Sequence, residues 1–375
     1  MKKTLLFGTI LAACIALGAI SATGADTVRF WYHFDDADNP MSDLVNAFEA
    51  ANPDIKIEAE NIPWGSYYDT LYTAIAAGSG PDTAMVKMFA QPRLIEMGAL
   101  EPIDDRISNW SGKADIQDNL FNITKGPDGK SYYMPVQYVA LYLYYRADLF
   151  AAAGLNPPAT CDDFRAAAKA LTKDGTYGFG FRGGKGGHDH WASLVLSTGA
   201  NFKPGGMTSD SAIAATQFVV DLFQKDKVFP PSAPNDGFKE IIGAFKAGKT
   251  AMTIHHIGSS NGMVEALGDK VSATTVPECG GGRWTAFCDE STAIFSAAKS
   301  KDAAWKWISF LSSAENNAMF NKATGQLPVT KSDSATWSLH EKRFVDATIN
   351  SLPFANLLPN VSETSDFVNT CLLYT

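Results

Sequence analysis

The sequence predicts an α/β protein in which mainly parallel sheets are flanked by helices. Two observations carry this prediction: strand-like and helix-like segments alternate from Thr27 onward, and short clusters of Gly, Pro and Asn separate them. The chain has room for two such units, because about 350 residues follow an apolar N-terminal segment.

In the first part of the chain, strands and helices alternate strictly. The segment after Thr27 is rich in β-branched and aromatic residues, and apolar residues then recur at helical spacing up to Ala51. A second helix ends at a Gly-Ser-Gly-Pro cluster that begins at Gly78. We expect strands at residues 27–34, 55–59 and 83–89 and helices at 44–51 and 64–77. This order favours parallel strand pairing.

The same alternation resumes near Tyr138. We expect strands at 138–145, 175–181 and 250–257, helices at 162–171, 211–223 and 241–247, and a helical pair rich in aromatic residues at 303–311 and 314–320. The glycine-rich stretch 182–187 is typical of a loop. It is not a phosphate-binding loop by pattern, because Lys185 lacks the following Ser or Thr.

The N-terminus has the three parts of a signal peptide. Lys2 and Lys3 precede an apolar run at 5–20, and small residues follow at 22–25. We expect residues 1–25 to be removed after Gly24 or Ala25 and the mature protein to reach the periplasm. Two alternatives are a short membrane span and lipidation at Cys14, which follows Leu-Ala-Ala. The apolar run continues past Cys14, and this favours cleavage and release.

The composition is that of an ordinary globular protein, with 46% hydrophobic and 19% charged residues. The formal charge of −9 becomes −11 once Lys2 and Lys3 are removed. An acidic surface disfavours nucleic acids and anionic membranes as partners. We expect a monomer that binds a small molecule.

The cysteines agree with export to an oxidising compartment. Cys279 and Cys288 bracket a glycine-rich segment that can fold back on itself, and we predict a disulfide between them. A zinc site is the rival interpretation, but the spacing fits no common ligand pattern.

Many short segments, in order along the chain, resemble the family 1 extracellular solute-binding proteins of bacterial ABC importers, which include the maltodextrin-binding proteins. The resemblance covers residues 28 to about 368 and rests on residues 52–57, Trp64, Tyr67, 76–82, 98–103, 129–135, 148–150, 153–155, 158–160, 244–252 and 325–329. It implies the two-lobed periplasmic binding protein fold of type II, with a ligand cleft between the lobes. Partners would be a sugar-like ligand and an ABC permease.

The resemblance also implies three crossings between the lobes. We expect one lobe from residues 26–136 plus 277–327 and the other from 137–276 plus 328–375, with hinges at 136–138, 276–277 and 327–328. Three departures from the family pattern stand out. Arg146 and Cys161 replace a usual asparagine and tryptophan, and the resemblance ends near Phe367, so we expect the second lobe to be truncated at its end.

The resemblance places candidate ligand contacts in the first lobe at the ends of strands. A sugar site needs flat aromatic faces and planar polar groups. The candidates are His33, Asp35, Asp36, Trp64, Lys87 and Phe89. For the residues after the first strand, a solvated turn is an equal alternative.

The remaining candidates lie at the first crossing and in the second lobe, and comprise Gln137, Tyr138, Arg182, His188, Trp191 and His256, together with Trp284 of the glycine-rich segment. Tyr138 could equally belong to the core, and Trp284 could equally anchor its loop.

An enzyme is the competing class. The histidines near residues 188 and 255 could hold a metal or act as an acid–base pair, but the sequence contains no H-E-x-x-H motif. We therefore expect no catalysis, no metal and no cofactor. The expected ligand is a neutral mono- or oligosaccharide; the basic residues Lys87, Arg182 and Arg283 leave an anionic polyol, such as glycerol phosphate or a uronate, as the alternative.

Overall fold

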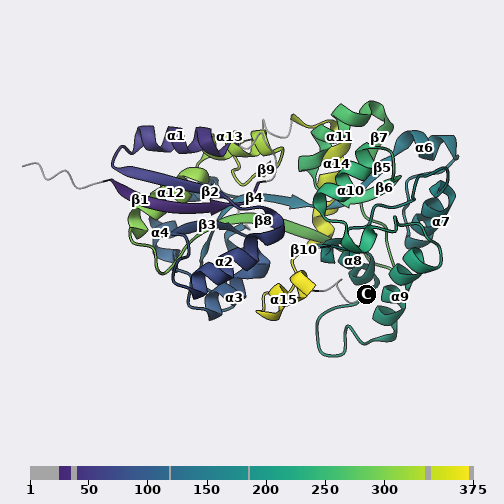
Figure 1. Cartoon of the computed structure of the whole chain (residues 1–375), viewed down its shortest axis with the longest axis horizontal. Coiled ribbons are helices and arrows are strands. Elements are labelled where there is room, and N and C mark those ends of the chain that lie inside the picture. Colours follow the sequence, from purple (N-terminus) through teal and green to yellow (C-terminus); the bar gives the residue numbers. More distant parts are fainter. Residues whose placement is uncertain (1–24, 35–39, 118–119, 185, 334–338, 371–375) are drawn as a thin grey trace, which may run out of the picture.

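The computed structural model describes residues 25–370 except 35–39, 118–119, 185 and 334–338, and places two sheets side by side (Figure 1). The large sheet has the order β2-β1-β3-β8-β4-β9, with β10 also paired to β8, and the small sheet has the order β6-β5-β7. The strands are β1 Asp26–Tyr32, β2 Ile55–Asn61, β3 Thr83–Val86, β4 Tyr133–Ala140, β5 Tyr142–Arg146, β6 Met252–His255, β7 Val271–Thr274, β8 Thr285–Ile294, β9 Leu327–Pro328 and β10 Ala355–Asn356.

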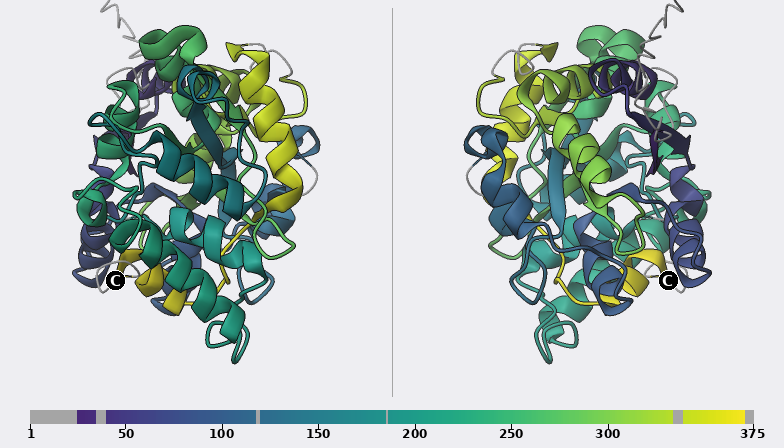
Figure 2. Two further views of the ribbon diagram at one scale, coloured as in Figure 1. Left: turned by 90° about the vertical axis from the view of Figure 1, so that its right-hand side faces the viewer. Right: turned by 90° about the vertical axis from the view of Figure 1, so that its left-hand side faces the viewer.

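Helices cover both sheets, as the two side views in Figure 2 show. They are α1 Met41–Ala51, α2 Tyr67–Ala76, α3 Gln91–Glu96, α4 Asp104–Asn109, α5 Leu120–Ile123, α6 Ala147–Ala152, α7 Cys161–Leu171, α8 His188–Val195, α9 Asp210–Gln224, α10 Phe238–Lys246, α11 Ser260–Leu267, α12 Lys301–Leu311, α13 Ala314–Thr324, α14 Lys342–Ser351 and α15 Glu363–Thr370.

The large sheet is parallel where the sequence alternates strand and helix. β1 pairs in parallel with β2 and β3, whereas β8 runs antiparallel to both β3 and β4. One face of the sheet packs against α1 and α12, where Phe30, Phe48 and Trp307 form edge-to-face contacts. The other face packs against α2 through Tyr67, Tyr68 and other buried residues. The predicted α/β class is confirmed.

The chain passes from one sheet to the other at Leu141. The sequence predicts one strand at 138–145, but β4 ends at Ala140 in the large sheet and β5 begins at Tyr142 in the small sheet. Leu141 is hydrogen-bonded to the start of β8 on both sides of its backbone: its N–H donates to Ala286 O at 3.1 Å, and its carbonyl oxygen accepts from Thr285 Oγ1 at 2.9 Å. A continuous apolar run conceals this break, because both strands are buried.

The predicted strand at 175–181 is absent from the described sheets. Its residues form only isolated bridges, Tyr177 with Thr250 and Gly180 with Thr253. Gly175 has φ +81°, a left-handed conformation unsuited to a strand, and Gly178 lies against the backbone of Ala168 in α7. The segment therefore lies beside β6 without joining a ladder.

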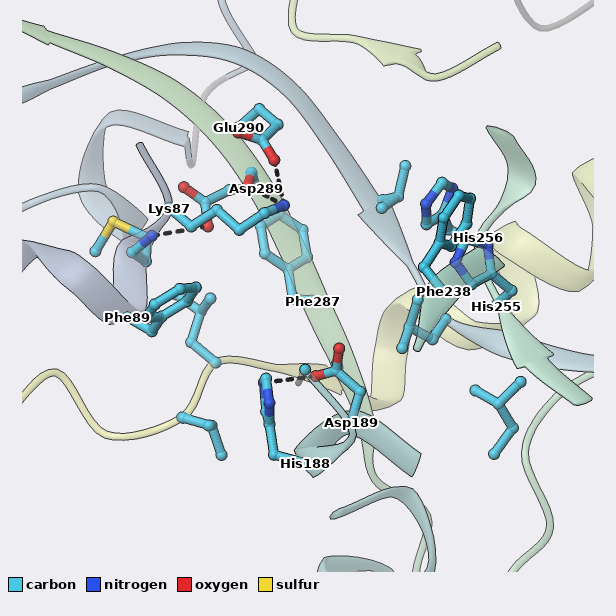
Figure 3. Close-up of a pocket in the computed structure, with 18 of the residues that line it drawn as sticks. Lys87, Phe89, His188, Asp189, Phe238, His255, His256, Phe287, Asp289 and Glu290 are labelled. Atoms are coloured by element: carbon cyan, nitrogen blue, oxygen red, sulfur yellow. Dashed lines mark hydrogen bonds and ion pairs between the residues drawn. The ribbon is translucent and has the colours of Figure 1, made fainter. Parts of the chain in front are cut away.

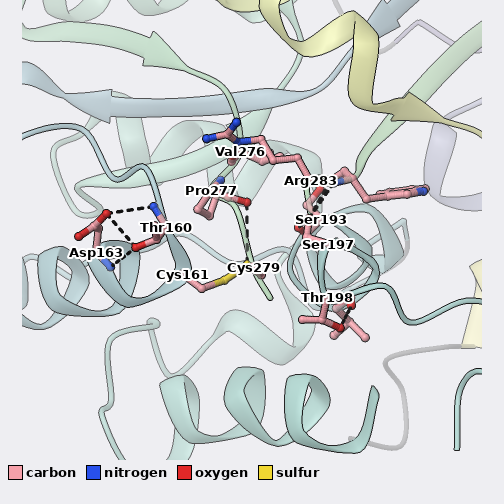
Figure 4. The surroundings of a disulfide bond; sticks show 12 residues. Thr160, Cys161, Asp163, Ser193, Ser197, Thr198, Val276, Pro277, Cys279 and Arg283 are labelled. Atoms are coloured by element: carbon pink, nitrogen blue, oxygen red, sulfur yellow. Dashed lines mark hydrogen bonds between the residues drawn. A yellow bond between two sulfur atoms is a disulfide. The ribbon is translucent and has the colours of Figure 1, made fainter. Parts of the chain in front are cut away.

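The disulfide joins Cys161 to Cys279, so the predicted bond between Cys279 and Cys288 is wrong (Figure 4). The Cα atoms of the bonded pair are 5.2 Å apart. Residues 159–161 lie beside Glu278. The backbone N–H of Glu278 donates to Ala159 O at 2.8 Å, and its carbonyl oxygen accepts from Cys161 N at 2.9 Å. Cys288 is instead a residue of β8, paired with Val139. Extended strand backbone separates it from the turn that holds Cys279.

The C-terminal part of the chain returns to the large sheet. Phe344 of α14 packs in the core around the small sheet, and the chain then forms β10 against the first residues of β8. Helix α15 follows and lies between the two halves in Figure 1. Residues 371–375 lie outside the described residues. In the described part of the chain, no helix combines the length and apolar character needed to cross a membrane.

Candidate ligand-binding cleft

A cavity of about 220 Å³ lies between the two sheets. It is lined by His33, Phe34, Trp64, Lys87, Met88, Phe89, Gln137, Val139, Leu141, Arg182, Gly186, His188, Asp189, His190, Phe238, Ile254, His255, His256, Trp284, Ala286, Phe287, Asp289, Glu290, Thr324, Gln326, Asn356, Leu357 and Leu358. These residues come from both sheets and from the C-terminal segment. Figure 3 shows Lys87 and Phe89 on one side of β8 and the paired histidines at the end of β6 on the other.

A buried carboxylate on β8 holds two basic side chains. Glu290 forms ion pairs with Lys87, through Oε1, and with His33, through Oε2 at 3.1 Å. Glu290 is 2% exposed. Burial alone would raise its pKa, but the charges and hydrogen bonds of His33 and Lys87 outweigh burial and lower the pKa to about 2. The carboxylate is therefore ionised at neutral pH.

The neighbouring carboxylate, Asp289, is held differently. Burial raises the pKa of Asp289 to about 6, although Lys87 and the backbone N–H of Met88 act to lower it. Met88 N donates to Asp289 Oδ1 at 3.1 Å, and Ser291 Oγ donates to Oδ2 at 3.3 Å. Both carboxylates of β8 thus have partners within the protein.

Aromatic rings form the apolar walls. Trp64 lies against His33, with ring centroids 4.7 Å apart, and the ammonium of Lys87 is 5.3 Å from the Trp64 ring. Phe89, Phe238, Trp284 and Phe287 line other parts of the cavity. Flat faces of this kind suit the C–H face of a sugar ring or a polyol chain.

Two neighbouring histidines, His255 and His256, bring neutral rings to the cleft. Burial lowers the pKa of His256 to about 3 and that of His255 well below its ordinary value. His256 Nδ1 accepts from Gly258 N at 3.1 Å, so the neutral ring carries its proton on Nε2. His188 is different, because its Nε2 pairs with Asp189 at 3.0 Å in the first turn of α8.

Several buried polar atoms at the cleft have no partner among the described residues. They are Gln137 Oε1, Gln326 Oε1 and His188 Nδ1, on side chains that are 6–8% exposed. Gln137 lies in β4 and Gln326 directly precedes β9, so both belong to the segments where the chain passes between halves. Because buried polar groups are nearly always hydrogen-bonded, these atoms are suited to bind ligand hydroxyls.

Nine of the predicted site residues line this cavity, namely His33, Trp64, Lys87, Phe89, Gln137, Arg182, His188, His256 and Trp284. Two do not. Tyr138 is not a lining residue and stacks on the lining residue Phe287, with ring centroids 5.9 Å apart, and Trp191 lines a separate apolar cavity of about 70 Å³. Asp35 and Asp36 lie outside the described residues. The ligand-binding roles of the lining residues stay predictions.

Sequence reasoning missed the contribution of β8 and of the C-terminal segment. Phe287, Asp289 and Glu290 were not among the candidates, nor were Gln326 and the residues around Leu357. A signal for the acidic pair exists: two carboxylates interrupt a strand of otherwise uncharged residues, which is costly unless they are paired. Among the described residues, no group of three or more His, Cys, Asp or Glu side chains is arranged to hold a metal.

A profile of the bacterial extracellular solute-binding protein family matches residues 34–318. The chain belongs to this family. It is a solute-binding protein of an ABC transporter rather than an enzyme, as the sequence predicts. The periplasmic-binding-protein-like fold agrees with this assignment.

Known proteins resemble this solute-binding protein over most of its length. A putative binding protein of Brucella abortus is 28% identical over 97% of this chain and 91% of its own. A solute-binding protein of Thermotoga lettingae, solved with α-D-tagatose, superposes with TM-score 0.80 at 23% identity, covering 93% of this chain and 95% of its own. One from Agrobacterium radiobacter, solved with ribitol, gives TM-score 0.81 at 20% identity, covering 93% and 94%. These structural likenesses show the shared fold.

One further relative is named for an anionic solute. An sn-glycerol-3-phosphate-binding periplasmic protein of Agrobacterium fabrum is 29% identical, but the match covers only 46% of this chain and 42% of that protein.

Proposed function

We infer that this protein captures a neutral sugar or polyol in the cleft between its two sheets and delivers it to the membrane permease of an ABC importer. The observation that carries the proposal is the set of buried polar atoms without a partner among the described residues on Gln137, His188 and Gln326, three side chains that line a cavity with aromatic walls. Hydroxyl groups can both donate and accept, and their carbon skeletons stack on aromatic rings.

The polar groups are distributed in a way that suits capture. Gln137 and Gln326 come from neighbouring segments of the large sheet, since Gln137 of β4 pairs with Pro328 of β9, two residues after Gln326. His188 and His256 approach from helix α8 and the end of β6. A solute bonded to both groups of residues would hold the two halves together, which is how ligands favour closed forms of two-lobed proteins.

The charges of the cleft support a neutral ligand over the anionic alternative. Of the three basic residues that favoured an anion, Arg283 donates to the backbone oxygens of Val276 and Ala159 and does not line the cavity. Lys87 is paired with Glu290. Carboxylates of Asp189, Asp289 and Glu290 also face the same space. An anionic solute would meet this negative charge.

Delivery from the periplasm completes the proposal. The family is one of extracellular proteins. We propose that residues 1–25 act as a cleaved signal peptide, with lipidation at Cys14 as the alternative, and that mass spectrometry of the mature protein distinguishes the two. Cleavage leaves a chain that begins at Ala25 or Asp26, whereas lipidation leaves a modified Cys14.

A binding panel tests the function. The mature protein is unfolded thermally with D-tagatose, ribitol, D-mannitol, maltose or sn-glycerol 3-phosphate, and positive results are followed by calorimetry. A ligand at about 100 times its Kd raises the apparent stability by about 2.7 kcal/mol. Stabilisation by a neutral solute, without any product, supports the proposal. Stabilisation by sn-glycerol 3-phosphate alone would favour the anionic alternative, and turnover would contradict both.

A further inference from the structure

One wall of the cleft carries an ammonium group whose charge is balanced inside the protein. Lys87 pairs with Glu290 Oε1, and its Nζ also donates to the backbone oxygen of Asp289 at 3.3 Å. The other oxygen of Glu290 is bound by His33 Nε2 at 3.1 Å. In Figure 3 the Lys87 side chain reaches across β8, and a dashed line joins its ammonium to the Glu290 carboxylate.

We propose that Glu290 sets the charge preference of the cleft: by occupying Lys87, it excludes anionic solutes and leaves a site for neutral polyhydroxylated ones. This inference rests on the proposed function, because it states how that site would separate a sugar or polyol from its acid or phosphate ester. Glu290 is then a specificity-determining residue.

The balance of charge around the cavity supports this role. The Lys and Arg side chains among its described lining residues are Lys87 and Arg182. Burial acts to raise the pKa of the Asp189 carboxyl, but His188 and, to a smaller degree, the nearby charge of Arg182 lower it below its ordinary value. Each cation therefore has a carboxylate near it. To bind one of these cations, an anion would have to displace the carboxylate beside it. Otherwise the anion would have to approach that carboxylate in a buried site, where water and salt screen the repulsion between like charges only weakly.

Apart from the pairs of Glu290 with Lys87 and His33, the packing of β8 gives no reason for a charge at this position. Glu290 lies in the middle of the large sheet, where β8 pairs with both β3 and β4, and the rest of β8 is uncharged apart from Asp289. A buried ion pair adds little net stability, because desolvation offsets the attraction between its members. A glutamine has the same length and can still accept from Lys87. What the carboxylate adds is the negative charge.

The experiment changes that charge alone. Glu290→Gln removes the charge and keeps the shape, and Glu290→Asp keeps the charge. Glu101→Gln is the matched control, because Glu101 pairs with Lys301 at 2.7 Å and does not line the cavity. Calorimetry on the mature protein measures the affinity for D-galactose, D-galacturonate, glycerol and sn-glycerol 3-phosphate, so that each anion has a neutral counterpart.

The expected result is a change of preference in one variant. Wild-type protein, Glu290→Asp and Glu101→Gln bind each anion at least about tenfold more weakly than its neutral counterpart. Glu290→Gln gains about tenfold or more in affinity for the anions, and added salt reduces that gain because Lys87 would then act as an accessible cation.

Two results would overturn the inference. One is a Glu290→Gln protein, folded by circular dichroism, whose affinity for the anions is unchanged. The other is wild-type protein that binds galacturonate as tightly as galactose, a measurement that needs no variant and decides the question even if Glu290→Gln does not fold.

Failure of the proposed function looks different. If wild-type protein binds no neutral sugar or polyol but Glu290→Gln gains anion affinity, the charge role of Glu290 stands and the proposed ligand class falls. If wild-type protein binds a neutral solute and the variant gains nothing, only the inference about Glu290 falls.

Discussion

The ring of Phe367 in α15 packs edge-on against Trp191 in α8, with ring centroids 5.5 Å apart. The preceding residue, Asp366, forms an ion pair with Arg93 of α3 at 2.6 Å. Helix α15 thus contacts a helix beside the large sheet and a helix beside the small sheet. These two contacts differ in kind, since one is apolar and the other is exposed and charged.

Replacement of Phe367 is expected to destabilise the protein more than replacement of Asp366. Phe367→Ala removes a partly buried ring and should lower the free energy of unfolding by about 1–3 kcal/mol. Asp366→Ala should lower it by about 1 kcal/mol or less, because its ion pair is solvent-exposed. Urea unfolding of both variants gives the comparison. Equal effects would mean that α15 is not held by its apolar contact.

Reduction should lower the stability of the protein by breaking the bond between Cys161 and Cys279, in which Cys288 takes no part. The bond closes a loop with a sequence separation of 118 residues, and its loss should cost about 2–4 kcal/mol of stability. Cys161→Ser and Cys279→Ser should each lower the melting temperature, and the wild-type value should fall in reductant. Cys288→Ser serves as the control. A reductant-sensitive melting temperature in Cys161→Ser would contradict the assigned pairing.

Loss of Gln137 should weaken ligand binding more than it weakens the fold. Gln137→Leu removes a buried carbonyl oxygen that has no partner among the described residues, so the folded state loses little. If a hydroxyl of the solute bonds to this oxygen, the variant should bind the solute about tenfold more weakly than the wild-type protein does. Calorimetry with the solute identified by the panel measures the loss. Lys342→Ala, on the exposed face of α14, is the control that should bind normally.

The buried histidines should make the protein sensitive to acid. His256 has a folded-state pKa of about 3 against an unfolded value near 6.5, so the unfolded chain takes up a proton first as pH falls. The stability that depends on neutral His256 is fully present above about pH 6.5 and is lost progressively down to about pH 3. His256→Gln should flatten the pH dependence of unfolding in that window by up to about 1.4 kcal/mol per pH unit.

The two carboxylates on β8, Asp289 and Glu290, should change the free energy of unfolding in opposite directions as pH falls. Glu290, with its pKa lowered to about 2, stabilises the fold above its unfolded value and loses that contribution as pH falls toward 2. Burial raises the pKa of Asp289 to about 6, so this carboxyl binds its proton more tightly in the folded state than in the unfolded chain. The free energy that Asp289 costs the folded state therefore grows as pH rises from about 4 to 6. Asp289→Asn should therefore raise stability more at pH 7 than at pH 4. An equal rise at both values would contradict the shift.

Local patterns predicted the elements that have strong local causes. The first three strands and the helices between them follow from hydrophobic periodicity and Gly or Pro boundaries, and the structure places them close to the expected residues. The break at Leu141 was not predictable in this way, because residues on both sides are buried and apolar. The pairing of Cys161 with Cys279 also depends on a long-range approach of two segments, which spacing does not encode.

Sequence reasoning found those residues of the candidate site whose type is unusual at their position, and those that the family resemblance indicated. Lys87 interrupts an apolar strand, and it lines the cavity. Its partner Glu290 went unnoticed because the pair is separated by about 200 residues and only the antiparallel pairing of β3 with β8 brings them together. Trp191 shows the reverse error, since an aromatic residue beside a polar loop is equally suited to the core.

The single residue between β4 and β5 has a mechanical consequence. Leu141 joins the two sheets and also forms part of the cavity surface, so a solute in the cavity would lie close to the axis of any rotation of one sheet against the other at this crossing. A rotation about that axis displaces groups near the solute only slightly and displaces the far rims of both halves much more. Such a rotation would couple a small adjustment around the bound molecule to a large movement of the outer surfaces.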